Sequence, residues 1–128
     1  MSALVVDTSS WIAYFAGDGS ALIEDALGSS TLLLPVVVAA ELLSGKMSRR
    51  DRAALGDLLD TLPACGIERA HWFRVGALRS KLAAKGLTVS TPDAHIAQCA
   101  LDANARLLSE DGIFRKIAAH APVHLAES

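Results

Sequence analysis

Short strand-like apolar runs alternate with helical patterns from one end of this 128-residue chain to the other. Each run is too short to be a helix, and the segments between them place apolar residues at helical spacing. Strands that alternate with helices form parallel sheets, because the chain must cross back over the sheet before each new strand. The alternation therefore predicts an α/β fold with three layers, α/β/α, around a central, mostly parallel sheet of four to five strands.

Glycines, prolines and capping residues set the expected boundaries. Pro35 suits the first turn of a helix, and Thr91 with Pro92 predicts the N-cap and first turn of a later one. We expect strands at residues 3–6, 31–34, 65–67, 106–109 and 123–125. We expect helices at residues 9–16, 20–27, 35–45, 48–60, 69–85, 91–103 and 113–119.

Length and composition favour a single domain over residues 1–128. Apolar residues make up 52% of the chain and charged residues 20%, which suits a compact core and excludes disorder. The N-terminal segment lacks a basic region, and the longest apolar stretch is broken by Pro35 and Glu41, so we expect a cytoplasmic protein without a signal or membrane span. Cys65 and Cys99 lack the spacing of a redox or metal motif and are expected to be buried free thiols.

Four acidic residues stand out against this apolar background. Residues 32–43 contain one ionisable side chain, Glu41, and an unpaired carboxylate in apolar surroundings predicts a cation nearby. Asp7 and Asp111 follow strand-like runs, and Asp93 opens a helix. These positions can meet at the carboxyl edge of a parallel sheet. Four converging acids would repel one another unless a divalent metal joined them, and their hard oxygen ligands suit Mg²⁺ or Mn²⁺.

Each acid also has a simpler explanation when it is taken alone. Asp7 is placed to cap the first helix, Asp93 lies where a helix dipole favours an acid, and Asp111-Gly112 is a common turn. Their occurrence together, in one order on one small α/β chain, favours metal-dependent chemistry on a phosphate.

With these acids in this order, the chain resembles the PIN-domain nucleases, and most closely the VapC-type ribonuclease toxins of bacterial toxin-antitoxin pairs. The resemblance extends over essentially the whole chain. The residues that carry it are Val6-Asp7-Thr8-Ser9, Val38-Ala39-Ala40-Glu41-Leu42, Thr91-Pro92-Asp93-Ala94-His95-Ile96-Ala97 and Leu107-Leu108-Ser109-Glu110-Asp111-Gly112-Ile113-Phe114.

The resemblance implies a PIN-like fold, an RNA substrate, a cognate antitoxin and a homodimer. It implies hydrolysis of RNA by metal-activated water, with Mg²⁺ or Mn²⁺ as cofactor. Thr8 and Ser109 match hydroxyl positions near the acids, whereas Glu110 stands where such toxins often have a basic residue. The catalytic, metal-binding quartet that it implies is Asp7, Glu41, Asp93 and Asp111.

The aromatic residues and histidines leave other interpretations open. One stripe of the first helix carries Trp11, Tyr14 and Phe15. These aromatic residues either pack in the core or line an exposed groove for the antitoxin. Trp72 and Phe73 suit a core or a dimer contact. The four histidines show no shared ligand spacing, so we expect surface or core roles for them.

Two other function classes remain as alternatives. One is a non-catalytic PIN-like module that binds RNA or protein, although such a module has no reason to keep four mutually repelling acids. The other is a haloacid-dehalogenase-like phosphatase, whose chemistry expects a D-x-D motif after the first strand. This chain has Asp7-Thr8-Ser9 there instead.

Overall fold

The computed structural model describes residues 2–127, which form five strands and seven helices. The strands are β1 (Leu4–Val6), β2 (Leu32–Pro35), β3 (Ala64–Cys65), β4 (Arg106–Leu108) and β5 (His124–Leu125). The helices are α1 (Thr8–Phe15), α2 (Ala21–Gly28), α3 (Val36–Leu43), α4 (Arg49–Asp60), α5 (Arg69–Ala84), α6 (Thr91–Ala103) and α7 (Ile113–Ala118).

The five strands form one sheet in the order β3-β2-β1-β4-β5, and every neighbouring pair is parallel. The predicted α/β fold is confirmed, with a sheet that is wholly parallel. The central strand β1 is buried along its whole length, as expected for a strand covered on both faces.

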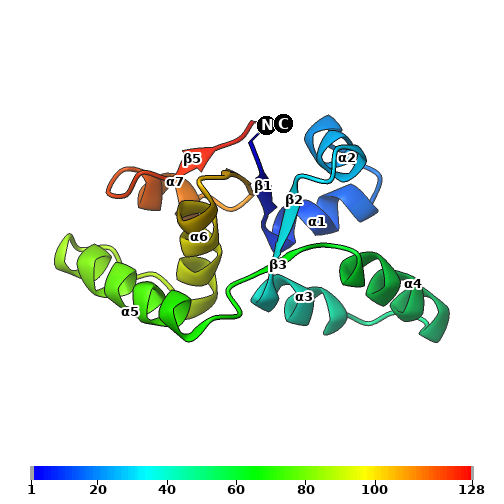
Figure 1. Cartoon of the computed structure of the whole chain (residues 1–128), viewed down its shortest axis with the longest axis horizontal. Helices are drawn as coiled ribbons and strands as arrows, with labels where there is room; N and C mark the ends of the chain where they lie inside the picture. The colour runs from blue at the N-terminus through cyan, green and yellow to red at the C-terminus, as the bar shows by residue number, and fades with distance from the viewer. Residues whose placement is uncertain (1, 128) are drawn as a thin grey trace.

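Helices cover both faces of the sheet. In Figure 1, α1 to α4 lie on one side of the strands and α5 to α7 on the other. Helix α6 packs across β1, β2 and β4, and α5 packs outside α6, while α2 contacts β1 and β2. Wholly buried apolar side chains such as Val5, Ile96 and Leu107 fill the space between these layers.

The direction of winding changes between β1 and β4. From β1 the chain continues to its neighbour β2, whereas β4 on the other side of β1 is reached only after β3. Val6 pairs with Leu108 at the carboxyl ends of these two strands, so Asp7 and Ser109 leave the sheet side by side. Open parallel sheets bind ligands at such a switch point.

Element boundaries differ from the expectations by at most two residues, and one cap is corrected. The N-cap of α6 is Ser90, not Thr91, and its hydroxyl accepts a hydrogen bond from the Asp93 amide at 3.2 Å. Ser90 and Asp93 have the spacing of a capping box, which explains why the helix starts there. Pro35 ends β2 and is the N-cap of α3, instead of lying in its first turn.

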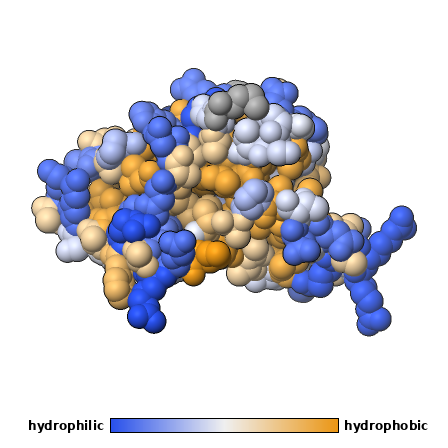
Figure 2. Space-filling model, viewed as in Figure 1, coloured by the Kyte–Doolittle hydropathy of each residue, from blue (hydrophilic) through white to orange (hydrophobic). Residues whose placement is uncertain are grey.

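The surface of the described residues is mixed in polarity. Figure 2 shows hydrophobic surface along the middle of one face, between hydrophilic ends over α4 and α5. Large apolar side chains are exposed at Ile12, Phe15, Ile67 and Phe73. None of the helices within residues 2–127 combines the length and hydropathy needed to cross a membrane.

Candidate functional site

Asp7 lies at the centre of the site. It is only 6% exposed, directly after β1, and it occupies the N-cap position of α1. Its carboxylate makes no capping hydrogen bond to that helix. Instead, one oxygen, Oδ2, accepts hydrogen bonds from the hydroxyls of Ser9 and Ser109, each at 2.8 Å. The simple interpretation of Asp7 as a helix cap is therefore wrong.

The two serines also hold the loop that carries Asp111. The Ser109 Oγ accepts from the Asp111 amide at 2.9 Å, and the Ser9 Oγ accepts from the Glu110 amide at 3.1 Å. Each hydroxyl thus links a loop amide to the Asp7 carboxylate. Ser109 was predicted from the sequence, but the role of Ser9 was missed, although its position two residues after Asp7 allows such a local bond.

Glu41 is exposed, which contradicts the expectation that it lies in apolar surroundings. Helix α3 buries Val38 and Leu42, which lie four residues apart on one face, whereas Glu41, at the edge of that face, is exposed. Helix α3 packs against α1, and the Thr8 hydroxyl of α1 donates a hydrogen bond to Glu41 Oε1 at 2.7 Å. Thr8 therefore contacts one of the four acids, as expected from its position.

Asp93 lies half-buried in the first turn of α6. Burial raises the pKa of Asp93 above its ordinary value, and the negative charges of Asp111, Asp7 and Glu41 raise it further, against a lowering by the Ser90 hydroxyl. Charges shift a pKa only when they lie near the titrating group. Because all three other acids act on Asp93, the fold brings the four acids into one region.

Asp111 combines a local role with an open position. Its Oδ1 accepts a hydrogen bond from the Ile113 amide at 3.1 Å, at the start of α7. The turn interpretation therefore holds for one of its oxygens. Among the hydrogen bonds of residues 2–127, none involves the second carboxylate oxygen of Asp7, Glu41 or Asp111, so each keeps an oxygen free for a cation.

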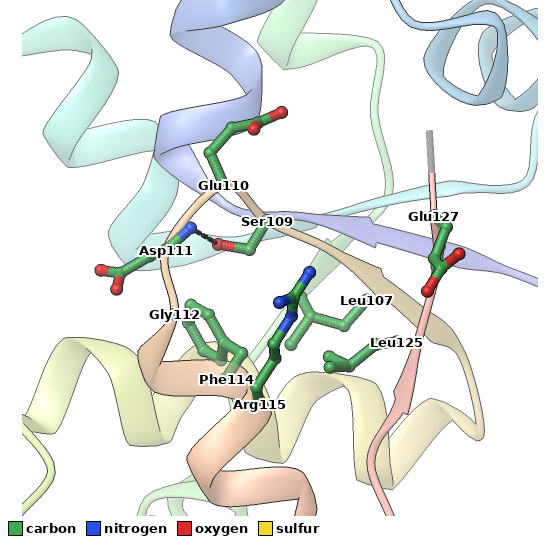
Figure 3. A pocket seen from close by; sticks show the side chains of 10 residues that line it. Leu107, Ser109, Glu110, Asp111, Gly112, Phe114, Arg115, Leu125 and Glu127 are labelled. Atoms are coloured by element: carbon green, nitrogen blue, oxygen red, sulfur yellow. Dashed lines mark hydrogen bonds between the residues drawn. The ribbon is translucent and has the colours of Figure 1, made fainter.

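A pocket adjoins the site on the β4–α7 side. Its lining includes Arg115 of α7 together with Ser109, Glu110, Asp111 and Glu127. Figure 3 shows the Arg115 side chain extending from α7 into this pocket, between the 109–111 loop and Glu127. The positively charged guanidinium of Arg115 therefore lies beside a group of acids, where it can bind a negatively charged phosphate.

The aromatic stripe of α1 is divided between core and surface. Trp11 is completely buried, which favours core packing for it, and its ring stacks on Phe15 with centroids 5.5 Å apart. Tyr14 donates a hydrogen bond to Glu24 at 2.6 Å. Phe15 is 48% exposed and lines an apolar groove with Met47, Leu55 and Leu58. Of the three, only Phe15 offers a large exposed apolar surface.

His71 and His95 form a second polar cluster, which the sequence pattern did not predict. His71 of α5 and His95 of α6 are buried, with their Nε2 and Nδ1 atoms 2.7 Å apart. Burial lowers the pKa of His95 to about 4, and the neighbouring His71 contributes to the lowering. The expectation of a core role is confirmed for these two histidines, whereas His120 and His124 are exposed.

A family model described as PIN domain matches residues 4–120 of the chain. The chain belongs to the PIN-domain family. Ribonuclease VapC11 of Mycobacterium tuberculosis strain H37Rv is 31% identical over 124 residues, which cover 90% of this chain and 91% of the relative. This PIN-domain protein is therefore also a VapC homologue.

Solved structures support the same fold. DNA-bound VapBC from Salmonella typhimurium superposes with a TM-score of 0.80 at 18% identity, covering 98% of each chain. VapBC-5 from Mycobacterium tuberculosis, described as a member of the VapBC family of toxin-antitoxin systems, has a TM-score of 0.67 at 22% identity over the full length of both chains. At these identities the likeness concerns the PIN fold itself.

Proposed function

We propose that this PIN-domain protein is a metal-dependent endoribonuclease and the toxin of a toxin-antitoxin pair. The observation that carries the proposal is the buried Asp7 at the β1/β4 switch point, whose charge acts on Asp93 together with those of Glu41 and Asp111. The similarity to a ribonuclease named VapC11 supports the reaction class. An RNA substrate makes the cytoplasm the expected location.

The four acids fit a hard divalent cation such as Mg²⁺ or Mn²⁺. Carboxylate oxygens are the ligands that these ions prefer, and Asp7, Glu41 and Asp111 each keep one oxygen free of hydrogen bonds within the described residues. No three of these carboxylates in residues 2–127 bring oxygens within 4.8 Å of one another. A bound divalent cation would offset the like negative charges of these acids.

The bound cation and the surrounding side chains would have different roles in hydrolysis. A divalent cation held by the quartet would lower the pKa of a water molecule and offset negative charge on the phosphodiester. We infer that Asp93 is the general base, because its raised pKa increases its affinity for a proton. Ser9 and Ser109 fix the orientation of Asp7, and Arg115 is placed to bind a neighbouring RNA phosphate.

We propose that the antitoxin occupies the apolar groove between α1 and α4. Phe15 contributes an exposed ring to this groove, and the rest of its apolar lining is Met47, Ala54, Leu55 and Leu58. An aromatic residue in an apolar groove is typical of a site that accepts an apolar segment of a partner. The homodimer stays a proposal as well, with the exposed Ile67 and Phe73 as its candidate contacts.

RNA cleavage by the purified protein tests the proposed activity. We expect cleavage with Mg²⁺ or Mn²⁺, no cleavage in excess EDTA, and a loss of roughly 100-fold or more in Asp7→Asn, since the central carboxylate is removed. Asp57→Asn changes an exposed acid on α4 and serves as the matched control. Cleavage that persists unchanged in EDTA or in Asp7→Asn would exclude this function.

A further inference from the structure

A chain of polar groups, with the buried side chains of His71 and His95 at its centre, connects α5 and α6 with the start of α3. The His71 Nδ1 lies 3.0 Å from Asp102 Oδ2, and the His71 Nε2 lies 2.7 Å from the His95 Nδ1. At the other end, the His95 Nε2 lies 3.4 Å from the amide nitrogen of Val37. We call Asp102, His71 and His95 the imidazole relay.

The two ends of the relay determine the direction of its hydrogen bonds. The Val37 amide can only donate, so the His95 Nε2 must be unprotonated and accept. The proton of neutral His95 is then on Nδ1, which donates to the His71 Nε2. His71 in turn carries its proton on Nδ1 and donates to Asp102. Both imidazoles are therefore neutral Nδ1–H tautomers.

Asp102 anchors the outer end of the relay. The Arg74 guanidinium donates to both of its carboxylate oxygens at 2.9 Å, and the Gln98 amide donates at 2.8 Å. Burial opposes ionisation of Asp102, but the hydrogen bonds from Arg74, Gln98 and His71 outweigh it and lower the pKa of Asp102 to about 2. Asp102, which accepts the hydrogen bond from the His71 Nδ1, is thus ionised at neutral pH.

Packing fixes the position of the His95 ring. The indole of Trp72 stacks on it with centroids 4.5 Å apart and an interplanar angle of 4°. On another side Gly66, at φ +84°, approaches so closely that a Cβ there would lie 2.2 Å from the His95 Cε1. The ring has little freedom to turn away from Val37.

The Val37 amide belongs to a helix start that lacks a local cap. The N-cap residue of α3 is Pro35, and no side chain there caps the helix, whereas Ser48 and Ser90 cap α4 and α6 with their own hydroxyls. The first amides of a helix have no partner within it and need one from elsewhere. The His95 imidazole supplies this partner from a neighbouring helix.

We propose that His95 is a positioning residue: its imidazole caps α3 from α6 and thereby fixes Glu41, which α3 carries, relative to Asp93, which lies two residues before His95 on α6. The inference rests on the proposed function, in which Glu41 and Asp93 bind the same cation. His95 itself does not contact the substrate or the cation in this role.

A metal site at the relay is a weaker interpretation of the same residues. His71, His95 and Cys99 are the described residues whose possible ligand atoms lie within 4.8 Å of one another. The relay already uses both nitrogens of each histidine. The Cys99 Sγ lies 3.9 and 4.0 Å from the two nitrogens of His95, so neither ring lone pair is directed at it in preference to the other. Metal binding would require breaking hydrogen bonds that are already satisfied.

The wild-type protein provides the first test. Nitrogen-15 NMR of the histidine side chains should show both His71 and His95 as Nδ1–H tautomers at neutral pH, with a coupling across the hydrogen bond between them. An Nε2–H tautomer of His95 would overturn the proposal, because that nitrogen would then be unable to accept from Val37.

Variants provide the second test. His95→Gln retains an acceptor carbonyl near the position of Nε2, whereas His95→Leu retains apolar volume without an acceptor. We expect His95→Leu to speed hydrogen exchange of the Val37 amide about tenfold, the effect of losing a helix cap, and to weaken Mn²⁺ binding about tenfold. His95→Gln and His120→Leu, which alters an exposed histidine, should stay close to wild type.

The outcomes separate this inference from the proposed function. Unchanged Val37 exchange and Mn²⁺ affinity in His95→Leu, or equal losses in His95→Gln and His95→Leu, would overturn the positioning role. If wild-type protein bound no Mn²⁺, or bound it as tightly after Glu41→Gln, the proposed metal site would fail. Faster Val37 exchange in His95→Leu would then still show the cap, but without a catalytic consequence.

Discussion

The carboxylate of Asp7 lies where an acid can cap a helix, but it accepts hydrogen bonds from serine hydroxyls instead. A buried acid after a strand commonly caps the next helix, yet here its Oδ2 receives two serine hydroxyls and the helix goes without that cap. Hydrogen bonds to a carboxylate offset part of the cost of burying it. They also fix its orientation, which a metal ligand requires.

Ser109 gives a prediction about this orientation. In Ser109→Ala, Asp7 loses one of its hydroxyl donors and the Asp111 amide loses its acceptor. We expect Mn²⁺ affinity and RNA cleavage to fall roughly 10- to 100-fold, the usual effect of removing a partner of a metal ligand. Ser109→Thr keeps the hydroxyl and should stay near wild type. Equal behaviour of the two variants in Mn²⁺ titrations would show that the hydroxyl has no such role.

His95 gives a prediction about pH. Its pKa is lowered from 6.5 to about 4 in the folded protein, so between these pH values the unfolded chain binds more protons at this residue. Stability from neutral His95 is complete above pH 6.5 and is lost as pH falls towards 4, by about 3 kcal/mol. Urea unfolding in EDTA at pH 7, 5.5 and 4.5 measures the loss. His95→Gln should lose less, and an identical pH dependence would contradict the assigned pKa.

At the scale of elements, local sequence signals determined most of the fold. Helix α6 starts at a Ser90–Asp93 pair and α4 at Ser48, where the hydroxyl accepts from the Asp51 amide at 3.0 Å. Such caps and the apolar spacing are readable in a sequence. The exposure of Glu41 is not, because it depends on which side of α3 faces its neighbours. In an almost wholly apolar helix, the sequence pattern does not distinguish those sides.

Helix α1 gives a prediction that separates core from interface. Phe15→Ala should weaken binding of the cognate antitoxin about tenfold or more with little loss of stability, because its ring is 48% exposed in the groove. Trp11→Ala should instead destabilise the fold by roughly 3–5 kcal/mol, since the indole is fully buried. Calorimetric titration and thermal unfolding distinguish the two. Unchanged antitoxin affinity in Phe15→Ala would place the interface elsewhere.

At the scale of the whole molecule, the sheet order brings distant residues together. Asp7 and Ser109 lie about a hundred positions apart in sequence but follow neighbouring strands that pair at Val6 and Leu108. A motif order shared with a known family made this convergence predictable. The imidazole relay was not predictable, since His71, His95 and Asp102 follow no spacing rule and meet only through the packing of α5 on α6.

Thermal unfolding with and without Mg²⁺ tests whether the four acids converge on one cation. In EDTA, Asp93→Asn should be as stable as wild type or more stable, because burial and three like charges already disfavour the ionised Asp93. Mg²⁺ should raise the Tm of wild type and of Asp57→Asn by binding the folded state, and should raise that of Asp93→Asn much less. A capping role alone predicts instead that Asp93→Asn loses roughly 0.3–1 kcal/mol. An Asp93→Asn variant that is less stable in EDTA and keeps the full Mg²⁺ shift would contradict the account.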